Sequence, residues 1–118
     1  MEIAVRVCSC SFCIKHGAAW TGSPAGSLRI SIKDLSLVSK YAFGTETAYF
    51  HVCLKCGVAP VVTSFIDGRL YAVVNANVFE GIDTSLFQRS SSGFADEGAK
   101  VRLERRKLNW IANVEYDT

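Results

Sequence analysis

Five cysteines in two short clusters constrain this chain more than any other feature of its sequence. The first cluster has the spacing C-x-C-x-x-C and the second has the spacing C-x-x-C-G. The members are Cys8, Cys10, Cys13, Cys53 and Cys56. Thiols at ligand spacing predict a metal site, and zinc is the metal whose protein sites use this kind of spacing. Buried cysteines without a metal are the alternative, but they would not explain the pairing.

The chain carries no sign of export or of membrane insertion. The segment Met1–Arg6 lacks the basic region and apolar core of a secretory signal. No apolar run approaches the roughly 20 residues that a membrane-spanning helix needs. We therefore expect a cytoplasmic protein with reduced thiols and no membrane partner. An odd number of cysteines also argues against a framework of disulfides.

Size and composition predict a single compact domain over residues 1–118. Hydrophobic residues make up 49% of the chain and charged residues 20%, as in ordinary soluble domains. The net charge of +2 is too small to indicate a polyanionic partner. Basic residues gather between Lys100 and Lys107 without interleaved aromatic residues. A solvent-exposed helix face is therefore the favoured interpretation, and no nucleic-acid partner is expected.

Most of the chain has the pattern of β-strands. Leu28, Ile30 and Ile32 alternate with polar residues, which predicts a half-buried strand. Asp67-Gly68 between two apolar runs predicts a hairpin with a type I′ turn. The other predicted strands are Ile3–Val7, Leu37–Phe43, Ala48–Val52, Val58–Phe65, Arg69–Asn77 and, last, part of Asn109–Tyr116.

Helix is expected in few places. Glu97–Lys107 has a helical composition, and Asp83 could cap a short turn that includes Thr84 and Ser85. Ser9–Gly17 is predicted to be irregular, and Gln88–Gly98 is predicted to be a polar surface loop. The predicted fold class is therefore mainly β, with one short C-terminal helix.

The number of thiols in each cluster bears on its chemistry. Three thiolates on one tetrahedral zinc leave a fourth position, which can accept a water or a substrate. A substrate thiol bound there would lose its proton and become a nucleophile at neutral pH. Cys53 and Cys56 cannot complete a tetrahedral site alone, so a metal there needs other ligands as well.

Both cysteine segments resemble those of the glutathione-dependent formaldehyde-activating enzymes, a family that includes centromere protein V. The matching segments are Val7–Cys13, Lys15–Gly17, Tyr41–Thr45, Phe50–Gly57, Val74–Asn75 and Glu80–Asp83. This resemblance implies a zinc-binding β-tent fold, with Cys8, Cys10 and Cys13 at a catalytic-type Zn²⁺ site. It implies that Cys53 and Cys56 form half of a structural site. The activity it implies is a carbon–sulfur lyase reaction that joins glutathione to formaldehyde as S-(hydroxymethyl)glutathione.

The chain departs from the family pattern before the first cluster. Family members usually carry an earlier C-x-C-G pair, and none precedes Cys8. Three explanations stay open: a later start of the chain, a degraded structural site, or one metal shared by both clusters. Two functions also stay open. The first is a zinc-dependent enzyme, and the second is a non-catalytic, zinc-scaffolded binding module that uses the Lys100–Lys107 face.

Two histidines and two aromatic residues near the clusters are further candidates. His16 could be a fourth ligand or a proton carrier, or simply an exposed residue. His51, two residues before Cys53, is expected to be an ordinary strand residue or a hydrogen-bond donor behind the metal. Phe12 and Trp20 could form the floor of a small pocket, although core packing is the favoured interpretation.

Four polar residues complete the candidates. Lys15 and Arg69 could bind the carboxylates of glutathione or could be ordinary surface charges. Asn75 and Asn77 interrupt an apolar strand, so they are expected to face either a polar pocket or solvent.

Overall fold

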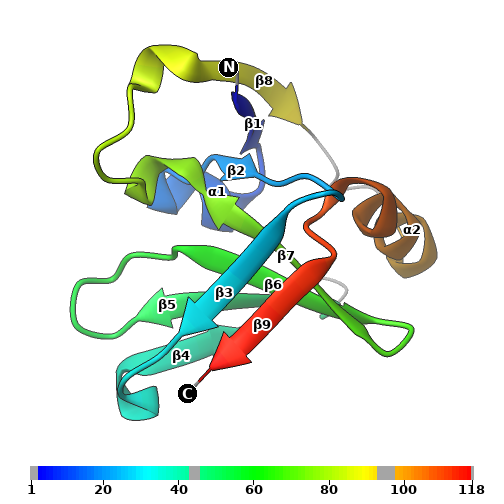
Figure 1. Ribbon diagram of the computed structural model, residues 1–118, viewed down its shortest axis with the longest axis horizontal. Coiled ribbons are helices and arrows are strands. Elements are labelled where there is room, and N and C mark those ends of the chain that lie inside the picture. Colours follow the sequence, from blue (N-terminus) through cyan, green and yellow to red (C-terminus); the bar gives the residue numbers. More distant parts are fainter. Residues whose placement is uncertain (1–2, 43–45, 93–97, 118) are drawn as a thin grey trace.

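A computed structural model describes residues 3–42, 46–92 and 98–117 (Figure 1). Within these residues the chain forms one seven-stranded sheet, one two-stranded sheet and two α-helices. The strands are β1 (Ile3–Cys8), β2 (Trp20–Thr21), β3 (Ser27–Ser31), β4 (Val38–Tyr41), β5 (Tyr49–Cys53), β6 (Val61–Ile66), β7 (Arg69–Asn75), β8 (Phe87–Ser92) and β9 (Asn113–Asp117). The helices are α1 (Ser11–His16) and α2 (Ala99–Asn109), with 3₁₀ turns at Leu35–Leu37, Ala76–Val78 and Thr84–Leu86. The predicted mainly β class, with a helix near the C-terminus, is confirmed.

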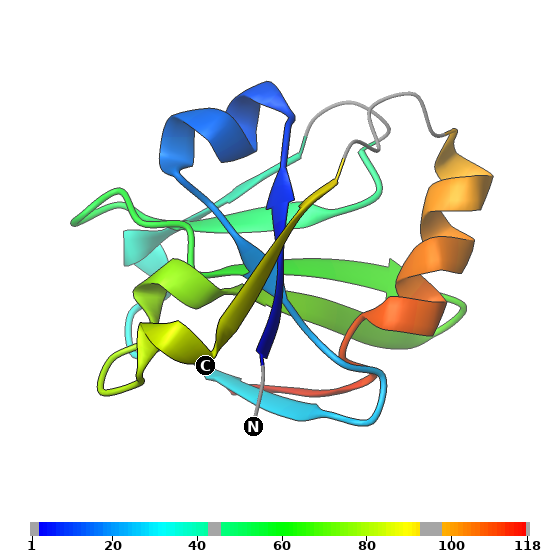
Figure 2. The same cartoon turned by 90° about the horizontal axis from the view of Figure 1, so that it is seen from above.

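The large sheet has the strand order β4-β5-β6-β7-β2-β1-β8. Neighbouring strands pair antiparallel from β4 to β1, and β8 then pairs parallel to β1. The two-stranded sheet of β3 and β9 lies on one side of β6 and β7, and α1 lies on the other side (Figure 2). Helix α2 stands near the tip of the β6–β7 hairpin, where Lys107 pairs with Asp67 at 2.9 Å.

The central hairpin forms as the sequence predicts. Asp67 and Gly68 have φ angles of 51° and 80°, and a type I′ turn needs positive values at both positions. Strands β6 and β7 are buried along most of their length, in agreement with their nearly continuous apolar sequence. The core around them includes Trp20, Val62, Val73 and Trp110.

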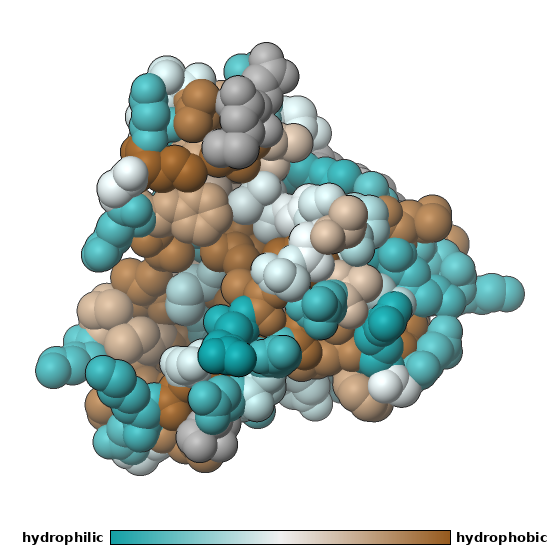
Figure 3. All heavy atoms as spheres, viewed as in Figure 1, coloured by the Kyte–Doolittle hydropathy of each residue, from teal (hydrophilic) through white to brown (hydrophobic). Residues whose placement is uncertain are grey.

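The half-buried strand β3 also forms where residue alternation predicts it, and its exposure alternates residue by residue. Its partner β9 alternates in the same way. The outward side chains of Arg29 and Glu115 form an exposed ion pair at 3.0 Å. Figure 3 shows polar side chains gathered over these two strands, with apolar side chains to their left. No helix in the described ranges is both long and apolar enough to span a membrane.

Two predicted irregular segments turn out to be regular. Ser9–Gly17 contains helix α1. The helix ends at Gly17, which has a φ of 58°, and the next amide, that of Ala18, donates to the Cys13 carbonyl. Part of the predicted loop Gln88–Gly98 belongs to β8. Strand β8 lies at the sheet edge, and its side chains from Gln88 to Ser91 are exposed. Its sequence is therefore polar and lacks the alternation of apolar residues that predicts a strand.

Other boundaries differ by a few residues. The strand predicted at Leu37–Phe43 is β4, which follows a 3₁₀ turn; Phe43 itself lies outside the described residues. The helix predicted at Glu97–Lys107 begins at Ala99 and ends at Asn109, and Glu97 is outside the described part. The predicted cap at Asp83 is confirmed, since its carboxylate accepts from the Ser85 amide at 2.9 Å.

Candidate metal centre and adjoining cavity

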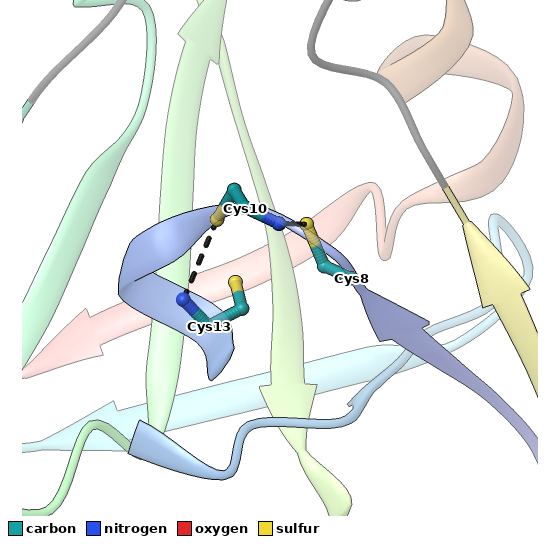
Figure 4. Close-up of side chains that lie close together, drawn as sticks. All are labelled: Cys8, Cys10 and Cys13. Carbon is teal, nitrogen blue, oxygen red and sulfur yellow. Dashed lines mark hydrogen bonds between the residues drawn. The ribbon is translucent and has the colours of Figure 1, made fainter. Parts of the chain in front are cut away.

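The first cysteine cluster is assembled where β1 runs into α1. Cys8 ends β1, Cys10 caps the N-terminus of α1, and Cys13 lies inside that helix. Their Sγ atoms all lie within 4.8 Å of one another (Figure 4). Sulfur atoms on one tetrahedral zinc are roughly 3.8 Å apart when each Zn–S bond is about 2.3 Å. The cluster could therefore hold a metal ion after small side-chain adjustments.

Each sulfur of the cluster accepts a hydrogen bond from an N–H group. The Cys10 amide donates to Cys8 Sγ at 3.5 Å, and the Cys13 amide donates to Cys10 Sγ at 3.4 Å. Trp20 Nε1 donates to Cys13 Sγ at 3.2 Å. Such donors favour the negatively charged thiolate, which is the form that binds metal. The surroundings of the cluster therefore fit a metal bound by three thiolates.

The thiols also influence one another in the metal-free protein. The hydrogen bond from the Cys13 thiol lowers the pKa of Cys8 to about 5, with smaller contributions from Cys10 and from the charge of Arg102. The pKa of Cys13 is raised, because its proton is held by Cys8 and because its side chain is buried. The contact between the two thiols therefore favours the thiolate at Cys8 and the protonated thiol at Cys13.

All three cysteines line a cavity of about 150 Å³. Both tryptophans of the chain, Trp20 and Trp110, are also on its wall. The remaining described lining residues are Ala4, Arg6, Gly22, Thr47, Ala48, Phe50, Val62, Val73, Arg102, Arg105, Arg106 and Asn109. The cavity thus joins a thiol cluster, an apolar floor and a set of basic side chains.

We define the arginine wall as the four cavity-lining arginines Arg6, Arg102, Arg105 and Arg106. Arg6 comes from β1 and donates to Asn109 Oδ1 at 3.2 Å. The other three come from α2. Arg106 is only 5% exposed, donates to Thr47 and Ser64, and lies 5.0 Å above the ring centre of Trp110.

The prediction that the basic run forms a solvent-exposed helix face is wrong for Arg106, which is buried, while Arg102 and Arg105 are partly exposed and line the cavity. Positions 102, 105 and 106 are spaced i, i+3 and i+4, so they share one helix face. That face is turned toward the cavity. The spacing was visible in the sequence, but the direction of the face depends on how α2 packs. Lys107 points elsewhere and pairs with Asp67 and Glu104.

The second cysteine pair lies apart from the first. Cys53 ends β5 and Cys56 is exposed in the following turn, where Gly57 has a φ of 80° and donates to the Cys53 carbonyl at 2.8 Å. Hydrogen bonds from the backbone of Cys56 and Lys55 lower the pKa of Cys53. Among the described residues, neither thiol belongs to a group of three potential ligands. Their role as metal ligands stays a prediction.

Neither histidine joins the first cluster in the structure. His16 is exposed, stacks on Phe12 with ring centres 4.0 Å apart, and places Nδ1 2.9 Å from the Phe12 carbonyl oxygen. His51 is buried, and its Nε2 lies 2.9 Å from Thr63 Oγ1. The pKa of His51 is lowered by its burial and by the charge of Lys40. These contacts agree with the ordinary structural interpretations of both residues.

The remaining candidates divide between the cavity and other places. Trp20 lines the cavity, whereas Phe12 and Lys15 line a second hollow beside Tyr41. Arg69 is exposed at the start of β7. Lys15 and Arg69 are not among the described residues that line the cavity, and the basic side chains there are those of the arginine wall, which the sequence interpretation missed.

The two asparagines hold the backbone rather than face the cavity. Asn75 is buried, accepts from the Ala19 amide at 3.2 Å and donates to the Ala59 carbonyl at 3.2 Å. Asn77 is exposed, donates to the Gly17 carbonyl and accepts from Arg89 at 3.2 Å. Both link β7 and its following turn to neighbouring segments.

Comparison with known proteins gives information on the fold and none on the chemistry. No protein-family model matches the chain, and no curated protein does. Among solved structures, the chain is similar to a Rhodobacter sphaeroides protein crystallised as a structural genomics target. The two share 24% sequence identity with a TM-score of 0.53, over 75% of this chain and 80% of that one. At this identity the similarity concerns the fold alone.

Proposed function

We propose that this protein binds zinc through Cys8, Cys10 and Cys13 and joins a small thiol, such as glutathione, to formaldehyde or another small aldehyde. One observation carries the proposal: the three thiols that could hold a metal also line the cavity. A molecule that enters the cavity therefore meets the cluster. The proposal extends the sequence resemblance to the glutathione-dependent formaldehyde-activating enzymes, which are carbon–sulfur lyases.

The set of donor atoms supports zinc as the metal. Thiolate ligands select zinc, copper(I) or iron–sulfur clusters, and iron–sulfur clusters usually need four cysteines. Cys8, Cys10 and Cys13 supply three. Catalytic zinc sites typically have three protein ligands and keep the fourth position for water or substrate. Zinc bound here would hold an incoming thiol as a thiolate at neutral pH.

The residues of the chain would position the reactants. Hydrogen bonds from Trp20 and from two backbone amides fix the three sulfurs. Apolar side chains, among them Val62 and Val73, line the cavity close to the cluster and would limit the water around the reacting carbon. The positive charge of Arg102 acts on Cys8 and favours the thiolate there. The cavity thus offers a partly dry site with fixed sulfur atoms.

The reaction balances without an oxidant or a reductant. The thiol sulfur forms a bond with the aldehyde carbon, and the π electrons of the C=O bond move to oxygen. The proton that leaves the thiol ends on that oxygen. The product is a hydroxyalkyl thioether, and the reverse reaction releases the same two molecules.

Exchange NMR on the zinc-loaded full chain tests the proposal. Thiols and formaldehyde combine in water without a catalyst, so the exchange rate between glutathione and its adduct must be compared with buffer alone. We expect the protein to accelerate this exchange and Cys10→Ser to abolish the acceleration while the circular dichroism spectrum is kept. Ser9→Ala, at an exposed position beside the cluster, is the matched control and should keep both. Acceleration unchanged by Cys10→Ser would reject the proposal.

The same measurements test the alternative function, that of a non-catalytic, zinc-scaffolded binding module. That module would take up zinc without accelerating the exchange, and it would contact a partner through the Lys100–Lys107 face. Arg102, Arg105 and Arg106 line the cavity, which leaves fewer basic side chains on the outer face of α2. The position of these arginines therefore favours the enzyme over the module.

A further inference from the structure

We propose that Cys53 and Cys56 form half of a zinc site that a second copy of this chain completes, so that zinc links two copies into a symmetric dimer. Each copy supplies two thiolates to one tetrahedral ion. The proposed function uses the first cysteine cluster and not this pair, so each of the two proposals can fail without the other.

The turn after β5 brings the two thiols together. The sulfur of Cys53 accepts hydrogen bonds from the backbone amides of Cys56 and Lys55 and from the Cys56 thiol. Gly57 closes the turn with a φ of 80°, and its amide donates to the Cys53 carbonyl at 2.8 Å. Two thiols in contact, with backbone amides directed at one of them, can bind a single metal ion through both sulfurs.

The pair lacks the other two ligands of a tetrahedral site. Structural zinc sites almost always have four ligands, which are cysteines and histidines. Among the described residues, no third cysteine, histidine or acidic side chain joins these thiols in a group that could hold a metal ion. The other three cysteines of the sequence form the first cluster. A second copy related by a two-fold axis brings an identical pair to the same point, and the two pairs together make four ligands.

The position of the pair makes it accessible to a second copy. Cys56 is exposed and Cys53 is half-buried. The segment between β5 and β6 projects at the edge of the molecule in Figure 1 and again, after a quarter turn, in Figure 2. Two such turns can therefore meet while the bodies of the two molecules stay apart.

Exposed apolar side chains lie beside the pair. The Leu54 amide donates to the Leu37 carbonyl at 2.8 Å, and the Cys53 amide donates to the Val58 carbonyl at 2.8 Å. These contacts hold the 3₁₀ turn Leu35–Leu37 against the cysteine turn. We define the apolar rim as the four exposed residues Leu35, Leu37, Leu54 and Val58. Exposed apolar side chains that gather at one place are typical of contact sites. When the two cysteine pairs meet, the rim of each copy covers the rim of the other.

The charges of the turn also fit a shared ion. A zinc ion with four thiolate ligands carries two net negative charges. Lys55 lies between the two cysteines, and its positive charge acts on Cys53. Two copies bring two such lysines to the site, and together they offset the charge of the zinc centre.

The contact between the copies should depend on the metal. Stable interfaces usually involve about 20–30 residues on each side. The apolar rim has only four members, which is too few for a stable interface without another source of binding energy. We therefore expect the dimer to form with zinc and to separate without it.

Analytical ultracentrifugation of the full chain tests this dependence, with a phosphine reductant present to prevent disulfides. Mass and zinc content are measured with excess zinc, after chelation, and after zinc is added back. We expect a dimer with about one and a half zinc ions per chain, a monomer after chelation, and recovery of the dimer with added zinc. Zinc at about 100 times its dissociation constant should strengthen the assembly about 100-fold.

Variants identify the residues responsible. The double change Cys53→Ser and Cys56→Ser should give a monomer that keeps its circular dichroism spectrum and about one zinc ion. Cys56→Ser alone, at the exposed thiol, is a second variant in case the double change disturbs folding. Leu54→Ala should weaken zinc-dependent dimerisation about fivefold or more, because the change occurs once in each copy.

Leu108→Ala is the matched control for Leu54→Ala. Leu108 is 73% exposed, and it lies on α2, across the molecule from the cysteine turn in Figure 1. This variant should keep the zinc-dependent dimer. Dimerisation that Leu54→Ala leaves unchanged would overturn the assignment of the apolar rim to the interface.

The outcomes separate this proposal from the proposed function. A chain that stays monomeric in excess zinc would overturn the shared site, whether or not zinc binds to the pair. A dimer that survives chelation, or that persists in the cysteine variants, would also overturn it. If the first cluster takes up no zinc, the proposed function fails. The zinc-linked dimer would then still form, with about half a zinc ion per chain.

Discussion

At the scale of single residues, Trp20 belongs to the apolar core and also contacts the cysteine cluster. It is 8% exposed and belongs to the core, while its Nε1 donates to Cys13 Sγ. Groups that hydrogen-bond to metal ligands typically change metal affinity by about 10- to 100-fold when removed. Trp20→Phe keeps most of the ring and removes the donor. We expect zinc affinity, measured by competition with a chromogenic chelator, to fall by about tenfold. Unchanged affinity would mean that this hydrogen bond does not support the metal site.

A second residue-scale prediction concerns His51 and acid stability. Its pKa in the folded protein is lowered by burial and by Lys40, below the value of about 6.5 expected in the unfolded chain. The neutral ring therefore favours folding above pH 6.5, and this contribution is lost as the pH falls through the lower, folded-state pKa. His51→Gln removes this titration, so the free energy of unfolding should fall less steeply between pH 7 and pH 5. Urea unfolding at several pH values measures the slope, and an equal slope in both proteins would refute the prediction.

At the scale of elements, helix α1 decides the geometry of the cluster, and Gly17 ends this helix. Gly17 has a φ of 58°, and a Cβ atom there would meet nothing within 4 Å. The cost of a side chain at this position is therefore backbone strain, not a clash. Gly17→Ala should lower the free energy of unfolding by about 1 kcal/mol. Gly17→Asn should cost less, because asparagine tolerates this conformation. Equal losses for both variants in urea unfolding would contradict this explanation.

The elements also show what the sequence could and could not predict. Two local patterns predicted the structure that forms, because each acts over a few residues. They are the alternation of Leu28, Ile30 and Ile32, which predicted strand β3, and the turn Asp67-Gly68, which predicted the central hairpin. Strand β8 could not be predicted from its composition. It forms because its backbone pairs with that of β1, and its exposed polar side chains show no pattern of burial. Helix α1 could have been predicted from Lys15-His16-Gly17, a typical helix end, but the cysteine spacing suggested a turn.

At the scale of the whole molecule, the cavity brings together parts of the chain that are far apart in sequence. The cysteines come from the first 13 residues, and three of the four arginines come from α2 near the other end. The sequence predicted the thiol cluster because its members are local. It did not predict the arginine wall, because that depends on which side of α2 packs against the sheet. The grouping of Cys8, Cys10 and Cys13 beside that wall is the structural basis of the proposed function.

X-ray absorption at the zinc edge tests the central claim most directly, with the full chain carrying Cys53→Ser and Cys56→Ser so that only the first cluster contributes sulfur. We predict one zinc per chain with three sulfur neighbours at about 2.3 Å and one lighter neighbour. Adding Cys10→Ser should lower the sulfur count or the zinc content. A protein that binds no zinc, or zinc with fewer than three sulfur neighbours before that change, would contradict the claim that Cys8, Cys10 and Cys13 form a metal site.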